Sequence, residues 1–148
     1  MEKVKLSVNA PLSAIDVLER CGYDLIEPSN TDIAAMTQDE FASAASTLAS
    51  RTVKCEVIDN PIPCSVSFSS PDWALEKWDG YLKLSAERAV ALGAKYWCFG
   101  NGSSRTLPDD TDAVKRVKAN FLAAVEKCAD AASRCGLSVI VEPLGPSV

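Results

Sequence analysis

Histidine is absent from the 148 residues of this sequence. Its absence excludes imidazole acid–base chemistry and histidine ligation of metals by this polypeptide. A run of about 18 apolar residues is also missing, so we expect no membrane span. Residues 1–5 contain no apolar stretch of the kind that a signal peptide needs, and we therefore expect a cytoplasmic protein.

Positive charge is in deficit, with 15 Lys and Arg residues against 20 Asp and Glu residues and a net charge of −5. A protein with a net negative charge is not attracted to the phosphate backbone of nucleic acids or to anionic membrane surfaces. We therefore expect neither a nucleic-acid partner nor a membrane partner. The deficit does not exclude an enzyme that acts on small anions.

Closely spaced cysteine pairs are missing as well. The sequence has six cysteines but no Cys-x-x-Cys motif, and a zinc site would need such pairs together with histidine. Most of the cysteines lie within apolar patterns, so we expect reduced, buried thiols, which are typical of cytoplasmic proteins. They are Cys21, Cys55, Cys64, Cys98, Cys128 and Cys135.

Apolar residues are plentiful, at 47% of the chain, which is enough for a hydrophobic core in one domain over residues 1–148. Five short apolar segments alternate with amphipathic stretches. We predict strands at residues 4–8, 24–27, 53–58, 95–99 and 138–142, and we expect the last of them to be buried.

Helix signals separate these strands. Pro11 suits the first position of a helix, and Thr37 with Glu40 forms a capping box. Ser70 begins a third helix, and the acidic residues at 109–112 begin a fourth. Glycines end three of the helices: Gly22, Gly93 and Gly136. The order β-α-β-α-β-α-β-α-β predicts the α/β class, with parallel strands and right-handed crossovers.

Two strand orders fit this alternation. Strands in the sequential order 1-2-3-4-5 would form an arc of a barrel, whereas the order 2-1-3-4-5 would make an autonomous flavodoxin-like domain. The residues by themselves leave both open.

Each predicted strand ends in polar or small residues. Because parallel strands share a carboxyl edge, we expect these residues to gather there, where α/β proteins place their active sites. Glu142 is the strongest candidate, since it ends an apolar segment and Pro143 fixes the exit of the chain. The strand-end residues are Asn9, Glu27, Asp59, Asn60, Gly100, Asn101 and Glu142.

The segment from Gly100 to Arg105 matches neither a P-loop nor a dinucleotide-binding fingerprint. We interpret it as a flexible loop between a strand and a helix, in which Arg105 is a candidate anion contact. Trp73, Trp78 and Trp97 are expected to be core or rim residues, because two of them lie on a predicted amphipathic helix.

Two segments resemble the xylose-isomerase-like TIM barrels, which include sugar isomerases, sugar epimerases and AP-endonuclease-type enzymes. Residues 91–105, Ala-Leu-Gly-Ala-Lys-Tyr-Trp-Cys-Phe-Gly-Asn-Gly-Ser-Ser-Arg, are similar to the fourth βα unit of that family. Residues 139–144, Val-Ile-Val-Glu-Pro-Leu, are similar to its fifth strand. The resemblance implies a parallel (βα)4β partial TIM barrel in the order 1-2-3-4-5, with helices on the outer face.

The resemblance also implies chemistry. It makes Glu142 both a ligand of a divalent metal, Mn²⁺ or Mg²⁺, and one of two acid–base carboxylates acting on a small sugar or sugar phosphate. We predict substrate contacts at Glu27, Asn101 and Arg105. In the endonuclease branch, histidines of the first half hold a zinc cluster, and their absence here excludes that branch.

The family's other ligands, an aspartate, a histidine and a second glutamate, come from later strands. A complete barrel needs about 250 residues, so 148 residues correspond to its N-terminal half, which we expect to be inactive alone. The alternative is a non-catalytic half-barrel that serves as an interaction or ligand-binding module. In either case the open sheet edges predict a homodimer.

Overall fold

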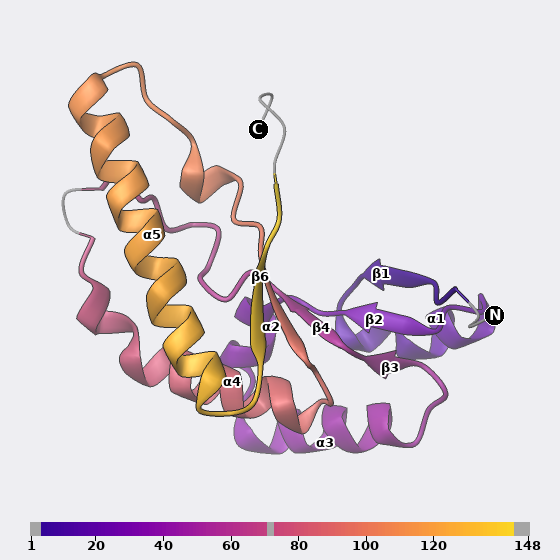
Figure 1. Cartoon of the computed structure of the whole chain (residues 1–148). Coiled ribbons are helices and arrows are strands. Elements are labelled where there is room, and N and C mark those ends of the chain that lie inside the picture. Colours follow the sequence, from indigo (N-terminus) through magenta and orange to yellow (C-terminus); the bar gives the residue numbers. More distant parts are fainter. Residues whose placement is uncertain (1–3, 71–72, 144–148) are drawn as a thin grey trace.

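The computed structural model describes residues 4–70 and 73–143, and its strands follow the predicted segments (Figure 1). The second, fourth and fifth predicted strands are found as single strands, the first is shorter than predicted, and the third is divided in two. The strands are β1 (Ser7–Asn9), β2 (Leu25–Glu27), β3 (Lys54–Cys55), β4 (Val57–Asp59), β5 (Tyr96–Phe99) and β6 (Ser138–Val141).

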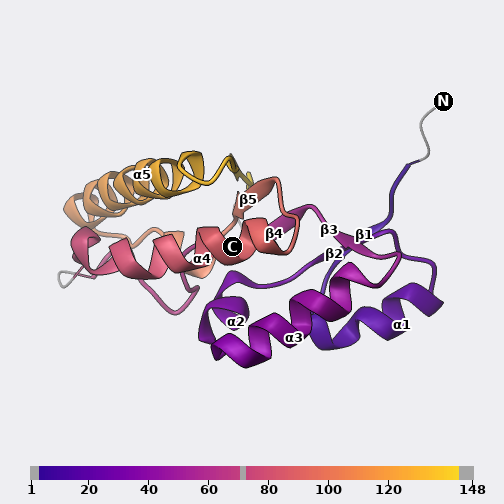
Figure 2. The same cartoon turned by 90° about the horizontal axis from the view of Figure 1, so that it is seen from below.

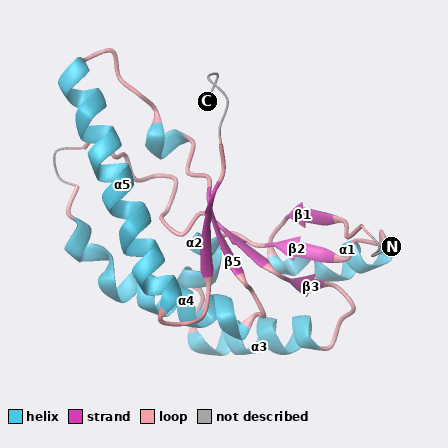
Figure 3. Cartoon of the chain, in the orientation of Figure 1, coloured by secondary structure: helices cyan, strands magenta, loops and turns pink. Residues whose placement is uncertain are grey.

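Helices occupy the connections between strands, except between β3 and β4, as Figure 3 shows. The α-helices are α1 (Ile15–Arg20), α2 (Asn30–Ala35), α3 (Gln38–Ala49), α4 (Asp79–Ala91) and α5 (Thr111–Ser133). Short 3-10 turns are η1 (Leu12–Ala14), η2 (Leu75–Trp78) and η3 (Ser103–Arg105). No helix in the described ranges is both long enough and apolar enough to cross a bilayer.

The described strands form two three-stranded sheets, with the orders β1-β2-β3 and β4-β5-β6, and every pairing is parallel. Ser29 and Asp59 form an isolated parallel bridge between the end of β2 and the end of β4. The amide of Asp59 donates to the carbonyl of Pro28 at 3.1 Å. This bridge brings the carboxyl ends of the two sheets together.

The third predicted strand is divided because its alternation shifts by one residue. Cys55 and Ile58 are both buried, with two residues between them instead of one. The consecutive amides of Lys95 and Tyr96 both donate to the carbonyl of Glu56, at 2.9 and 3.1 Å. An extra residue of this kind is a β-bulge, which bends a strand and increases its twist.

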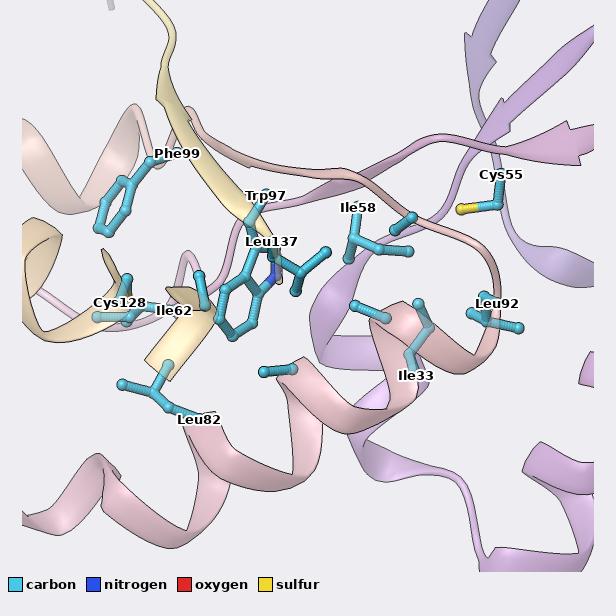
Figure 4. Close-up of a cluster of buried hydrophobic side chains, with 14 of the residues drawn as sticks. Ile33, Cys55, Ile58, Ile62, Leu82, Leu92, Trp97, Phe99, Cys128 and Leu137 are labelled. Atoms are coloured by element: carbon cyan, nitrogen blue, oxygen red, sulfur yellow. The ribbon is translucent and has the colours of Figure 1, made fainter. Parts of the chain in front are cut away.

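One face of the strands forms the core together with the helices. Ile26, Ile58, Trp97 and Phe99 are fully buried on this face, and Figure 4 shows Trp97 among side chains of α4 and of the loop that follows β4. Figure 2 shows helices α1, α2 and α3 together on one side of the sheet formed by β1, β2 and β3.

The opposite face of the strands is partly open. On this face Tyr96 is 40% exposed, and Ile140, which pairs with Cys98, is 42% exposed. Val141 lies on the other face, beside Phe99, and is 47% exposed because nothing among the described residues covers the end of β6 there. The prediction that β6 is a buried strand is therefore wrong. Its apolar composition suits a strand covered on both sides, but among the described residues β6 pairs only with β5.

The helix signals are confirmed at several ends and wrong at others. Thr37 and Glu40 form the predicted capping box at the start of α3. Helix α2, which begins at Asn30, has no counterpart among the predicted helix signals. The third predicted helix begins later than Ser70, with η2 at Leu75, and residues 71–72 of that prediction lie outside the described residues. All three predicted cap glycines have positive φ: Gly22, Gly93 and Gly136.

Asn30 is a fully buried polar residue that joins four parts of the fold. The two N–H groups of its Nδ2 are shared among three acceptors, the Pro61 carbonyl at 3.0 Å, Tyr81 Oη at 3.0 Å and Ser85 Oγ at 3.2 Å. Its Oδ1 accepts from Trp97 Nε1 at 3.2 Å. The side chain thus connects the start of α2, the loop after β4, helix α4 and strand β5.

Arg88 of α4 provides a second buried polar connection. Its Nη1 donates to the carbonyls of Ile33 and Met36, at 2.7 and 2.8 Å, and its guanidinium lies over the ring of Phe41. These carbonyls belong to the C-terminal end of α2, which has no further turn to satisfy them. Arg88 therefore holds α2 against α4.

We predict that Asn30→Ala lowers the free energy of unfolding by about 3 kcal/mol, because it leaves the Trp97 N–H and the Pro61 carbonyl buried without a partner. Urea unfolding followed by circular dichroism measures the loss. Asn120→Ala is the matched control: Asn120 makes a part-buried bond to the Phe68 carbonyl, and we expect about 1 kcal/mol. Equal losses for the two variants would contradict the role given to Asn30.

Candidate active site

The carboxyl ends of the strands gather the acidic groups of the candidate site. Asn9 and Glu27 lie opposite each other at the ends of β1 and β2. Asn9 Nδ2 reaches across to Asp59 Oδ2 at 3.0 Å, which connects the first sheet to the end of β4. Glu142 follows β6 directly, and its amide donates to the carbonyl of Phe99 at 3.2 Å.

Asp59 is half-buried and is held by two amides. Asn9 Nδ2 and Asn60 Nδ2 both donate to its Oδ2, at 3.0 and 2.8 Å. Its Oδ1 lies on the side of Gly100 and Glu142. One oxygen is thus committed to the protein, and the other faces the neighbouring strand end.

Asn60 and Asn101 join the loops that follow β4 and β5. Both have positive φ, 53° and 47°, a conformation that asparagine tolerates better than most residues. The amide of Asn101 donates to Asn60 Oδ1 at 2.6 Å, and the amide of Asn60 donates to the Cys98 carbonyl at 2.8 Å. The two loops are therefore fixed to each other beside Asp59.

Gly100 provides the space in which Glu142 lies. A Cβ at this position would stand 2.7 Å from Glu142 Oε2, 3.1 Å from Asn60 Oδ1 and 3.9 Å from Asp59 Oδ1. Real Cβ atoms do not approach an oxygen as closely as 2.7 Å, so a side chain here would displace the carboxylate. The missing side chain of Gly100 allows the carboxylates of Glu142 and Asp59 to lie over the same point.

Arg105 supports the backbone at this edge. Its Nη2 donates to the main-chain carbonyl of Glu142 at 3.1 Å, and its guanidinium lies 5.0 Å from the ring centroid of Phe121. Arg105 therefore fixes the exit of the chain from β6, in addition to its predicted role as an anion contact.

The electrostatics confirm that negative charge gathers here. Burial, followed by the charge of Glu142, raises the pKa of Asp59, and Glu27 adds to the effect. Burial, followed by the charges of Asp59, Glu142 and Glu27, raises the pKa of the Cys98 thiol to about 11. Three carboxylates thus act on the same region of the edge.

The structure places some of the predicted site residues at the carboxyl edge and others in the interior. Glu142 and Glu27 lie at the edge, and Ser7 Oγ donates to Glu27 Oε1. Asn101 is only 1% exposed, with its Nδ2 turned to the carbonyl of Ile62. Its substrate contact stays a prediction. The strand-end pattern predicts that Asp59 lies at this edge but not what holds it there. Its hydrogen bond with Asn9, which is 50 residues away in the sequence, is seen only in the structure.

The described residues do not form a complete metal site. No group of three Asp, Glu, Cys or His side chains among them is arranged to hold a metal ion. Asp59 Oδ2 already accepts two hydrogen bonds, which leaves its Oδ1 and the Glu142 carboxylate for a cation. Mn²⁺ and Mg²⁺ bind about six ligands, so further ligands would have to come from elsewhere.

No family model and no curated protein matches this sequence, but solved structures match its fold. One is a D-allulose 3-epimerase from Methylomonas sp. in complex with D-allulose. The match covers 95% of this chain and 51% of the epimerase, at 20% sequence identity and a TM-score of 0.72. Another is a xylose isomerase domain protein from Alicyclobacillus acidocaldarius subsp. acidocaldarius. That match covers 96% of this chain and 50% of the other protein, at 14% sequence identity and a TM-score of 0.69.

A third match is the IolI protein with a bound zinc atom. It covers 93% of this chain and 51% of IolI, at 19% sequence identity and a TM-score of 0.62. The chain thus spans about half the length of these proteins. At such identities the likeness concerns the fold alone. At that level the predicted resemblance to the xylose-isomerase-like barrels is confirmed.

We predict that Asp59 titrates above its ordinary pKa of about 3.9. Between the unfolded and folded pKa values the folded chain binds more protons. The contribution of Asp59 to the free energy of unfolding therefore falls as pH rises through this window and is constant above it. Carboxyl-detected NMR titration measures the pKa directly.

Glu142→Gln should bring the pKa of Asp59 down toward its ordinary value without restoring it fully, because burial is the larger cause. Glu126→Gln, at an exposed position on α5, is the matched control and should leave Asp59 unchanged. An unchanged Asp59 pKa in Glu142→Gln would contradict the proximity of the two carboxylates.

Proposed function

We propose that this chain is the N-terminal part of a divalent-metal-dependent sugar or sugar-phosphate isomerase or epimerase. The observation that carries the proposal is the Glu142 carboxylate at the carboxyl edge, seated over Gly100 beside Asp59. The fold supports it, because the similar solved proteins include sugar epimerases and a xylose isomerase domain protein.

The two sheets correspond, in this proposal, to a single arc of a TIM barrel in the order 1-2-3-4-5, with β3 and β4 as one bulged third strand. The Ser29–Asp59 bridge supports this interpretation. The buried face of the arc carries the helices, and the partly open face is the inside of the barrel.

The chemistry we propose is proton transfer at a carbon next to a carbonyl. Glu142 is exposed at the edge and would remove or return the proton as one of two acid–base groups. Glu27 would accept hydrogen bonds from sugar hydroxyls, and Arg105 and Asn101 would contact the substrate from the loop that follows β5. The second base and the remaining metal ligands would come from the half that completes the barrel.

The rival proposal is a non-catalytic half-barrel that binds a ligand or a partner through the same edge. The incomplete ligand set among the described residues is compatible with both proposals. A cytoplasmic location suits both proposals, because all six cysteines are free. The prediction that the thiols are buried is wrong for Cys21 and Cys64, which are exposed.

We predict that the isolated chain binds Mn²⁺ weakly and has no ketose epimerase activity. One or two carboxylates cannot compete with water for a hard cation that prefers about six ligands. Calorimetric titration of Mn²⁺ measures the first point. The second is assayed with D-allulose, before and after addition of the separately expressed C-terminal half of the Methylomonas D-allulose 3-epimerase.

Activity that appears only on mixing, and is lost with Glu142→Gln, would support the catalytic proposal. The amide keeps the shape of the side chain and removes both its charge and its basicity. Glu126→Gln in the mixture is the control and should retain activity. Tight Mn²⁺ binding by the isolated chain, or activity indifferent to Glu142→Gln, would refute it.

We also propose that the isolated chain forms a homodimer. Strand β6 presents the exposed side chains of Ile140 and Val141, and an edge strand of this kind readily pairs with another chain. A two-fold arrangement in which one arc covers another satisfies both edges.

We predict that light scattering after gel filtration finds a dimer for the natural sequence and a monomer for Ile140→Lys, since a charge on an edge strand blocks pairing. Leu122→Lys changes an equally apolar side chain that is 60% exposed on α5, and we expect it to remain dimeric. A monomer for the natural sequence would contradict this proposal.

A further inference from the structure

A groove with a volume of about 610 Å³ lies between helix α3 and the segment formed by η1 and the start of α1. Figure 2 shows α1 and α3 on the same side of the sheet formed by β1, β2 and β3. The groove therefore belongs to the helical face of the molecule. None of the described residues that line it is part of the candidate active site.

Helix α3 uses two of its faces differently. Phe41 and Leu48 are buried in the core. Glu40, Ala44 and Thr47, which are spaced by four and three residues, share a face of the helix and line the groove. This lining extends along α3 for about two turns of helix, so the groove is elongated and follows the helix axis.

The floor of the groove is apolar. Leu12 and Ile15 are buried there, and Met36 and Ala44 are half-buried. Most of the apolar surface that remains accessible therefore comes from Met36 and Ala44, and apolar contact alone supports only weak binding. Ser43 and Ala44 are small, which allows the backbone of another helix to approach α3 closely.

The rim of the groove is acidic. Asp16, Asp39 and Glu40 line it, and no Lys or Arg is among the described lining residues. Asp16 pairs with Arg51 at 2.7 Å, whereas exposed Asp39 has no partner among the residues that the structure describes. The hydrogen bonds from the amide and the hydroxyl of Thr37 lower the pKa of Glu40, so its charge is present at neutral pH.

We propose that this groove binds an amphipathic helix of a partner protein. The apolar side chains of that helix rest on Met36 and Ala44, and the lysine or arginine side chains on either side of them pair with the carboxylates of the rim. An apolar floor beside charges of one sign selects a helix with an apolar stripe beside charges of the opposite sign. The proposal goes beyond the proposed function, because it requires neither Glu142 nor a metal.

The probe is a fluorescein-labelled peptide of about 14 residues, or roughly four turns of helix, with leucines on one face and lysines on the other. Its counterpart has glutamate in place of every lysine. Fluorescence anisotropy should show saturable binding of the lysine peptide, with a Kd of about 10–100 µM at low salt. Binding should weaken at least fivefold at about 0.5 M salt, which screens exposed charges. The glutamate peptide should not bind.

Ser43→Lys is the main variant, because it places bulk and a positive charge in the groove and lysine favours a helix. Ser46→Lys makes the same change at an exposed position of α3 that does not line the groove. We expect Ser43→Lys to weaken binding at least tenfold and Ser46→Lys less than twofold. Both variants change the net charge equally, so the difference between them isolates the groove.

Circular dichroism checks that both lysine variants are folded. A milder pair decides the question if Ser43→Lys does not fold. Asp39→Asn removes one charge of the rim and should weaken binding at least twofold. Asp32→Asn removes an equally exposed charge from the first turn of α2, outside the groove, and should leave binding unchanged.

Equal binding of the two peptides, no saturation up to about 1 mM chain, or equal weakening by a groove variant and its control would overturn the proposal. Displacement of the peptide by an equal concentration of spermine would assign the groove to small cations instead. A homodimer that Ser43→Lys dissociates would assign it to a second copy of the chain, and either result would also overturn the helix site. Glu142→Gln should bind the peptide as the natural chain does, so a failure of the catalytic proposal leaves this one intact.

Discussion

The common direction of the strands is the constraint on which the candidate site depends. Every described pairing is parallel, so each strand delivers its last side chain to the same edge. Glu27, Asp59 and Glu142 meet there although more than 110 residues separate the first from the last. The Ser29–Asp59 bridge extends this alignment from one sheet to the other, and Gly100 gives the Glu142 carboxylate its space.

Gathering carboxylates at one edge is unfavourable by itself. Burial is the main cause of the raised pKa of Asp59, and the charges of Glu142 and Glu27 add to it. The amides of Asn9 and Asn60 offset part of the cost at Asp59. The remaining unfavourable free energy is offset by interactions elsewhere in the fold, such as the buried hydrogen bonds of Asn30 and Arg88 and the aromatic core around Phe68.

Local signals made much of the fold predictable. The capping box at Thr37, the cap glycines and the positions of the strands all depend on residues that are close together in the sequence. The bulge at Glu56, helix α2 at Asn30 and the exposure of β6 depend on distant partners. Glu142 was a candidate from the sequence because an apolar segment precedes it, whereas the hydrogen bond that ties Asp59 to Asn9 joins residues that are distant in the sequence and is seen only in the structure.

The proposed function requires Glu142 to exchange a proton with a carbon next to the carbonyl of a ketose. Proton NMR of D-allulose in D₂O, incubated with this chain and a completing half-barrel, measures that exchange directly. The account predicts that deuterium enters the carbon-bound position as the epimer forms, and that neither occurs with Glu142→Gln. Formation of the epimer without incorporation of deuterium would contradict it.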